Sequence, residues 1–75
     1  MSEGPYAVIL VYSTSHALRG EKVLGRAGIA CKLVPVPREL SSDCGICIRV
    51  VGEEAETAEA ALVEACVGIE GTYQI

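Results

Sequence analysis

An unbroken apolar run near the start of the chain, Tyr6 to Tyr12, constrains the fold because it leaves no polar side chain for water on either side. The run is rich in β-branched and aromatic residues, which favour an extended strand. Such a run predicts a strand that is covered on both faces of its sheet. It is also far too short to cross a bilayer, which takes about 20 apolar residues.

Small or apolar residues recur at helical spacing in two later segments, 16–27 and 53–67, and this spacing predicts two helices. The hydroxyls of Ser13–Ser15 precede the first helix as candidate N-caps, and Gly28 supplies its C-terminal stop. Gly68 is expected to end the second helix, whose acidic first turn suits the helix dipole. The predicted buried faces are Ala17, Gly20, Val23, Leu24 and Ala27 in the first helix, and Ala55, Ala58, Leu62, Ala65 and Cys66 in the second.

Three further strands are predicted at 31–36, 46–51 and 72–75. The resulting order, β-α-β-β-α-β, is typical of the ferredoxin-like α+β fold. Its four-stranded antiparallel sheet is expected to have the order 4-1-3-2, with both helices on one face. A small open three-layer α/β arrangement is the main rival. A chain of 75 residues is expected to form one domain, residues 1–75.

In this topology, the loop before the third strand lies at the same end of the sheet as the start of the first helix. Cys44 is therefore expected near Tyr12, Ser13 and the N-terminus of that helix. Helix N-termini and nearby cations lower the pKa of a thiol and so favour the reactive thiolate. His16 and Arg38 are the candidate cations, which makes Cys44 the candidate nucleophile of the chain.

Gly45 would let the backbone turn tightly and leave the sulfur of Cys44 open. Cys44 as an ordinary loop residue is the competing interpretation, and position and composition leave both open. Cys31 and Cys66 are expected to be structural, with Cys66 in the core. Five hydroxyls are candidates to hydrogen-bond an anionic sulfur or selenium group: Ser13, Thr14, Ser15, Ser41 and Ser42.

Cys44 and Cys47 form a C-x-x-C pair at the start of a predicted strand. Residues three apart in a strand are separated by about 10 Å, whereas a disulfide needs Cα atoms within about 7 Å, so a bond would require a turn at Gly45. A metal site built from Cys44, Cys47, His16 and Asp43 is an alternative. Structural zinc sites usually draw on two such ligand pairs, so we expect no metal, and no cofactor beyond a persulfide or selenide on Cys44.

The formal net charge is −4, and all six basic residues lie between positions 19 and 49. This acidic balance argues against nucleic acid as a partner, and no basic run suggests a membrane patch. No signal-peptide pattern opens the chain. A cytoplasmic location with reduced thiols is therefore expected.

Three stretches carry a resemblance to a known family: residues 12–19 (YSTSHALR), 28–29 (GI) and 33–45 (LVPVPRELSSDCG). Along nearly its whole length the chain resembles the putative selenium/sulfur carrier protein-like family of small bacterial domains. The most specific stretch is Pro-Arg-Glu-Leu-Ser-Ser-x-Cys-Gly. Family members carry the segment that matches Ser13 to His16 and the Cys-Gly that matches Cys44-Gly45, whereas Cys47 is not part of the shared motif.

The resemblance implies a carrier without turnover of its own, in which Cys44 holds a persulfide or selenide. It also implies a cysteine desulfurase-like donor and a sulfur or selenium acceptor as protein partners. Two alternatives stay open: a regulatory or anion-binding module of the same fold, and a Cys/His metal-binding domain.

The expected fold leaves one face of the sheet without helices. Tyr6, Val8, Leu10 and Tyr12 of the first strand point to one face, and Ala7, Ile9 and Val11 to the other. Whichever set faces away from the helices is expected to form an exposed apolar strip, which is uncommon on monomers. We therefore expect a homodimer that pairs sheet faces, with a partner protein on the same face as the rival. Arg49 argues against the dimer, since it would place a charge on that face.

Overall fold

The computed structural model describes residues 5–40 and 45–74. Over these residues the elements follow in the order β1 (Tyr6–Val11), α1 (Thr14–Arg26), β2 (Cys31–Pro35), β3 (Ile46–Val51), η1 (Gly52–Glu54), α2 (Ala55–Glu64) and β4 (Ile69–Gln74). The short 3-10 turn η1 leads directly into α2. The predicted order β-α-β-β-α-β is confirmed.

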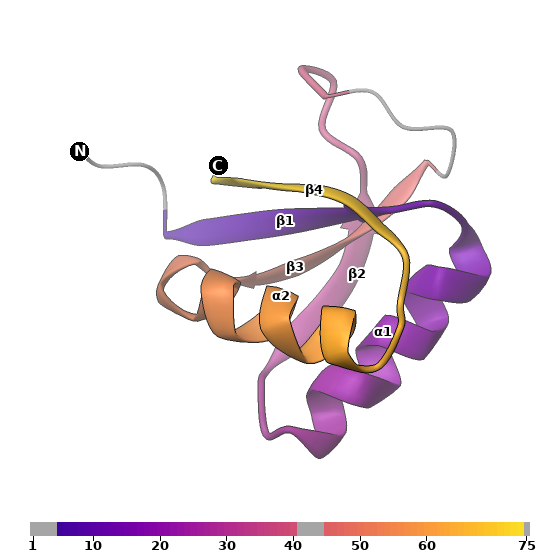
Figure 1. The fold of residues 1–75 in the computed structure, drawn as a ribbon. Coiled ribbons are helices and arrows are strands. Elements are labelled where there is room, and N and C mark those ends of the chain that lie inside the picture. The colour runs from indigo at the N-terminus through magenta and orange to yellow at the C-terminus, as the bar shows by residue number, and fades with distance from the viewer. Residues whose placement is uncertain (1–4, 41–44, 75) are drawn as a thin grey trace.

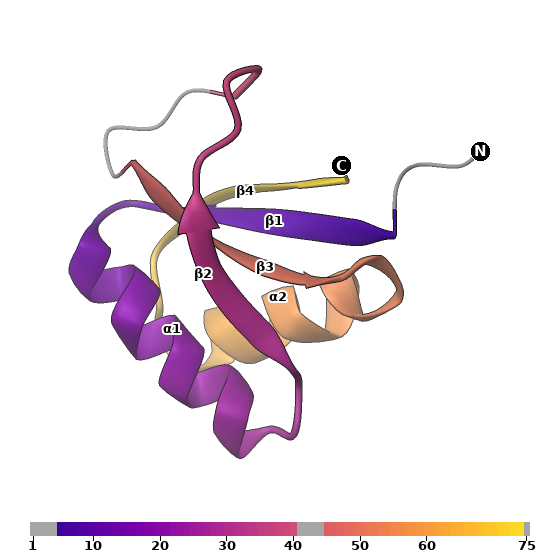
Figure 2. The same cartoon turned by 180° about the vertical axis from the view of Figure 1, so that it is seen from behind.

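The strands form one antiparallel sheet in the order β2-β3-β1-β4, which is the predicted 4-1-3-2 order named from the other edge. Figures 1 and 2 show α1 and α2 on the same side of this sheet. The fold is therefore the predicted ferredoxin-like α+β arrangement. The unbroken apolar run of β1 lies in the interior of the sheet, between β3 and β4.

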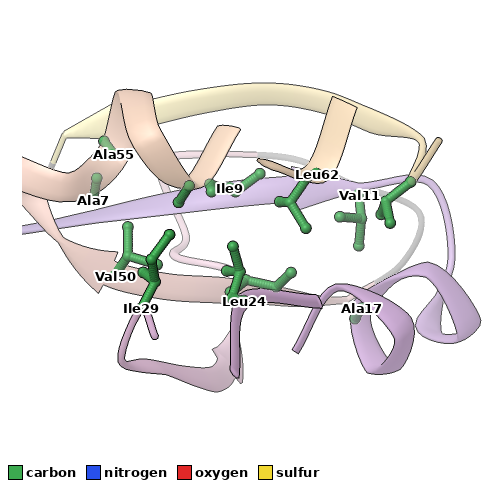
Figure 3. Close-up of a cluster of buried hydrophobic side chains, with 12 residues drawn as sticks. Ala7, Ile9, Val11, Ala17, Leu24, Ile29, Val50, Ala55 and Leu62 are labelled. Carbon is green, nitrogen blue, oxygen red and sulfur yellow. The ribbon is translucent and has the colours of Figure 1, made fainter. Parts of the chain in front are cut away.

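The core lies between the sheet and the two helices and is built from aliphatic side chains (Figure 3). β1 contributes Ala7, Ile9 and Val11 to it, each fully buried. Leu24 of α1 and Leu62 of α2 close over them and are also fully buried. Alternate residues of one strand thus face the helices, as the two-residue period of a strand requires.

The opposite face of the sheet differs from the expectation, because its apolar strip is covered. Val8 is 0 % and Leu10 is 2 % exposed. Together with the buried Cys47 of β3 they form a second small cluster. The side chains packed on this cluster are Val34, Val36 and Leu40, from β2 and the segment that follows it. The chain therefore covers by itself much of the surface on which the homodimer was expected, and the dimer stays a prediction that sedimentation can test.

The helix bounds differ from the predicted ones at both ends. α1 begins at Thr14 and α2 at Ala55. α1 ends one residue before the predicted residue 27, at Arg26, and α2 ends at Glu64 and not at the predicted residue 67. Ala27 is exposed, because it is the C-cap of α1 and not part of its buried face. Among the described residues, neither helix is long and apolar enough to span a membrane.

Cys66 is the clearest correction, since it is exposed and not in the core. Its φ of 63° lies in the left-handed region, where the chain turns out of α2. The place in the core belongs instead to Val67, which is 3 % exposed. Gly68 therefore does not end the helix, and β4 begins at Ile69 and not at the predicted residue 72.

Candidate functional site

The end of β1 leads into α1 through two residues, and the second of them, Ser13, caps the helix. Its backbone is extended (φ −157°, ψ 165°) and its hydroxyl accepts a hydrogen bond from the backbone N–H of His16 at 3.2 Å. This is the usual N-cap arrangement, and it satisfies one of the N–H groups that a helix N-terminus leaves without a partner. Thr14, Ser15 and His16 then occupy the first turn of α1.

The imidazole of His16 is held on the same cap. The hydroxyl oxygen of Ser13 lies 2.7 Å from Nδ1 of His16, so one hydroxyl orients both the backbone and the ring. The ring of Tyr12 meets the imidazole edge-on, with centroids 6.4 Å apart and planes at 75°. The structure therefore brings together Tyr12, Ser13 and His16 at the start of α1. The predicted neighbourhood of Cys44 to these residues stays a prediction.

The backbone of Gly68 packs closely against the rings of Tyr12 and His16. A Cβ atom at Gly68 would lie 2.8 Å from Cδ2 of Tyr12 and 3.3 Å from Nε2 of His16. The backbone N–H of Tyr12 also donates to the carbonyl of Gly68 at 3.4 Å. A side chain at this position would push the largely exposed ring of Tyr12 and would press on the imidazole of His16.

The β2–β3 connection leaves the sheet at the same end. The backbone N–H of Val36 donates to the carbonyl of Gly45 at 3.3 Å, which closes the base of the connection. Gly45 has a φ of +77°, so the predicted tight turn at this residue is present. Cys44, together with Ser41, Ser42 and Asp43, lies outside the described residues.

Arg38 lies in a turn of the same connection and is exposed. The turn is closed by the backbone N–H of Leu40, which donates to the carbonyl of Pro37 at 3.0 Å. Within the described part of the chain, the side-chain hydrogen bonds of Ser13 and His16 are with each other and do not involve Arg38. Its role as a cation beside Cys44 stays a prediction.

The three described cysteines are free thiols in different surroundings. Cys47 lies on the face of the sheet without helices, where Val34, Val36 and Leu40 pack over its cluster, and it is fully buried. Its sulfur is 3.8 Å from the carbonyl oxygen of Pro35. Cys31 is half-buried against α1, and burial raises its pKa, with the carboxylate of Glu21 raising it further. Cys66 is exposed. Of these, Cys66 is the most exposed.

Metal binding finds no support among residues 5–40 and 45–74, where no three histidine, cysteine or acidic side chains come together. Two ligands of the metal alternative, Cys44 and Asp43, lie outside that part of the chain. The alternative with His16 and Cys47 as further ligands therefore stays open.

Sequence reasoning did not single out Gly68 or Arg19 for this end of the molecule. Nη2 of Arg19 donates to the carbonyl of Ala65 at 2.9 Å and so joins α1 to the C-terminus of α2. Neither role has a local sequence signal, because each depends on a contact between residues about 50 positions apart. Only the packing of the two helices reveals them.

The fold is ferredoxin-like, and Ser13 and His16 form a polar cluster at the start of α1, at the end of the sheet where the β2–β3 connection leaves it. Residues 6–74 match a family described as "Putative Se/S carrier protein-like", and the chain belongs to that family. The resemblance noted from the sequence is thereby confirmed. Searches of curated proteins and of solved structures found no match.

Proposed function

We propose that the protein carries sulfur or selenium as a persulfide or selenopersulfide on Cys44. The observation that supports this most is the family match over residues 6–74. The turn at Gly45 and the capped N-terminus of α1 lie at the same end of the sheet, which supports the assignment of this end as the carrier site.

The proposed step is an exchange that needs no added oxidant. The thiolate of Cys44 attacks the outer sulfur of a donor persulfide, R–S–S⁻. A new S–S bond forms on Cys44, the S–S bond of the donor breaks, and the donor leaves as its thiolate, R–S⁻. A donor that holds R–S–Se⁻ transfers selenium by the same exchange, and an acceptor thiolate reverses it.

The residues around Cys44 have separate proposed roles. The N-terminus of α1 favours negative charge through the helix dipole. Ser13 holds the imidazole of His16 at this end, where it and Arg38 are proposed to stabilise the anionic terminal atom. The hydroxyls of Thr14, Ser15, Ser41 and Ser42 are the further proposed hydrogen-bond donors.

The partners follow from this chemistry. A cysteine desulfurase-like enzyme is the proposed donor, and a protein thiol that passes the atom on is the proposed acceptor. The exchange requires a compartment that keeps thiols reduced, such as the cytoplasm. The carrier itself turns over no substrate in this scheme.

The test is anaerobic incubation of the reduced protein with glutathione persulfide, followed by alkylation and peptide mass spectrometry. We expect one added sulfur atom on the peptide that contains Cys44, and none there in Cys44→Ser. Cys66→Ser is the matched control, because it removes an exposed thiol and should leave the signal unchanged. A persulfide found on Cys66 in place of Cys44, or on no cysteine, would refute the proposal.

A further inference from the structure

Two like charges lie directly opposite each other on the face of the sheet that carries no helix. Lys32 of β2 pairs in register with Arg49 of β3, so both side chains project from the same face. Like charges in this position destabilise a sheet. Among the described residues, no carboxylate forms an ion pair with either of them. Within residues 5–40 and 45–74, the pair therefore has a structural cost that no carboxylate offsets.

Arg49 is held in place by its other neighbour on this face. Its guanidinium carbon lies 4.4 Å from the centre of the Tyr6 ring. A cation–π contact of this kind restrains the guanidinium. It does not use up the N–H donors as an ion pair with a carboxylate would. Arg49 is thus oriented beforehand, with donors left for a ligand.

A depression of about 270 Å³ lies beside these residues. It is close to the lower limit of the volumes that small-molecule sites have, roughly 300 Å³, so it suits a small ligand. Lys32 is exposed at its edge and Tyr6 is 39 % exposed. Its lining residues are Tyr6, Ala30, Cys31, Lys32, Arg49, Val50 and Val51.

We propose that Lys32, Arg49 and Tyr6 form a binding site for a phosphate-class oxyanion, either inorganic phosphate or the phosphate group of a small ester. A dianion neutralises both charges at once. The arginine offers a fork of donors that matches two phosphate oxygens, and the lysine offers a point charge. The site uses neither Cys44 nor the N-terminus of α1, so it stands or falls independently of the carrier function.

The test is an NMR titration of the ¹⁵N-labelled protein with inorganic phosphate, at an ionic strength held constant with sodium chloride. We expect saturable shifts of the amide signals of Tyr6, Lys32 and Arg49. Phenyl phosphate forms a second arm, and tighter binding of this ester would assign the site to a phosphorylated organic molecule. Acetate, with a single charge, should bind at least about tenfold more weakly than phosphate.

Lys32→Met should weaken phosphate binding by about tenfold or more, because it removes one of the two charges. Lys22→Met is the matched control, since it removes the same charge from an exposed position on α1 and should bind phosphate as the wild type does. Lys32→Met should melt no lower than wild type in chloride, because it relieves the repulsion. Absence of saturable shifts, or equal binding by both variants, would overturn the proposal.

Discussion

α1 and α2 end in the same backbone motif with different residues at its central position. At the end of α1, Ile29 N–H donates to the carbonyl of Leu24 at 2.9 Å and Gly28 N–H donates to that of Gly25 at 3.2 Å. At the end of α2 the corresponding bonds are Val67 N–H to Leu62 at 2.9 Å and Cys66 N–H to Val63 at 3.0 Å. Both are Schellman motifs, in which the residue after the C-cap adopts a left-handed conformation.

The left-handed residue is Gly28 in α1 and Cys66 in α2, with φ values of 79° and 63°. Glycine has no Cβ and adopts this conformation freely, whereas another residue loses about 1–2 kcal/mol there. In both motifs the next residue, Ile29 or Val67, packs into the core beside the helix. Burial of that apolar residue helps to hold even a cysteine in the strained conformation.

The N-termini of the two helices differ in the same way, with the residue of better local propensity in α1. α1 has a side-chain cap at Ser13, whereas Glu54 at the start of α2 makes no side-chain cap hydrogen bond. α2 receives its support from elsewhere, since Arg19 of α1 donates to the carbonyl of Ala65 at its far end. The start of α1 therefore has a local side-chain cap that α2 lacks, and the end of α2 has a tertiary hydrogen bond in addition to its local motif.

The largest effect is expected where α1 comes closest to the rest of the molecule. A Cβ at Gly20 would lie 2.6 Å from Cδ1 of Ile48 and 3.2 Å from Cδ2 of Leu62, both fully buried. Gly20→Val should therefore lower the free energy of unfolding by about 3 kcal/mol through overpacking. The measurement is denaturant unfolding.

Gly25→Val is the matched control for this prediction, because nothing lies within 4 Å of a Cβ at Gly25 of the same helix. Its free energy of unfolding should stay within about 0.5 kcal/mol of wild type. Equal losses for the two variants would show that α1 does not press on β3 and α2 at Gly20.

The two left-handed positions should respond to substitution in opposite directions. Gly28→Ala should lower the free energy of unfolding by about 1 kcal/mol, and Cys66→Gly should raise it by a similar amount. Cys66→Ala is the control, since it removes the thiol and keeps the Cβ, and it should have little effect. Chemical denaturation of the three variants measures this, and a loss of stability in Cys66→Gly would contradict the comparison.

The helix starts provide the next test. Ser13→Ala removes the side-chain cap of α1 and should lower the free energy of unfolding by about 1 kcal/mol. Glu54→Ala at the start of α2 should change it by less than about 0.5 kcal/mol, because no side-chain cap hydrogen bond is lost. Thermal melts followed by circular dichroism measure both variants. A larger loss in Glu54→Ala would show that α2 also depends on its own first turn.

The smallest effect concerns Cys31, which packs against α1 with its sulfur 3.9 Å from the carbonyl oxygen of Glu21. Because burial raises its pKa in the folded state, the folded protein holds this proton more tightly than the unfolded chain does. The stability linked to it is complete below the ordinary thiol pKa of about 8.5 and is lost as the pH rises through the folded value. Cys31→Ala should flatten the fall in stability between pH 8 and 10, and an identical fall in both proteins would contradict the assignment.

The sequence by itself determined the order of elements, the sheet topology and the ends of α1. Every side chain from Tyr6 to Val11 is apolar or aromatic, so this strand can only lie in the interior of a sheet. Ser13 and Gly28 act through hydrogen bonds to residues at most four positions away. The polar end of the molecule was predictable for the same reason, since topology alone places Tyr12, Ser13 and His16 beside the β2–β3 connection.

Only the tertiary structure decided the features that depend on distant partners. The periodicity of α2 assigned Cys66 to the core, but the chain turns at Cys66, two residues before the predicted stop at Gly68. Val67 is buried there and Cys66 is left exposed. The apolar strip on the face without helices was expected to be open, but on that face Val34, Val36 and Leu40 pack over Val8 and Leu10. Gly68 behind His16, and Lys32 opposite Arg49, likewise follow from register and helix packing. A local pattern cannot encode these contacts, because their energies arise only once the strands and helices are assembled.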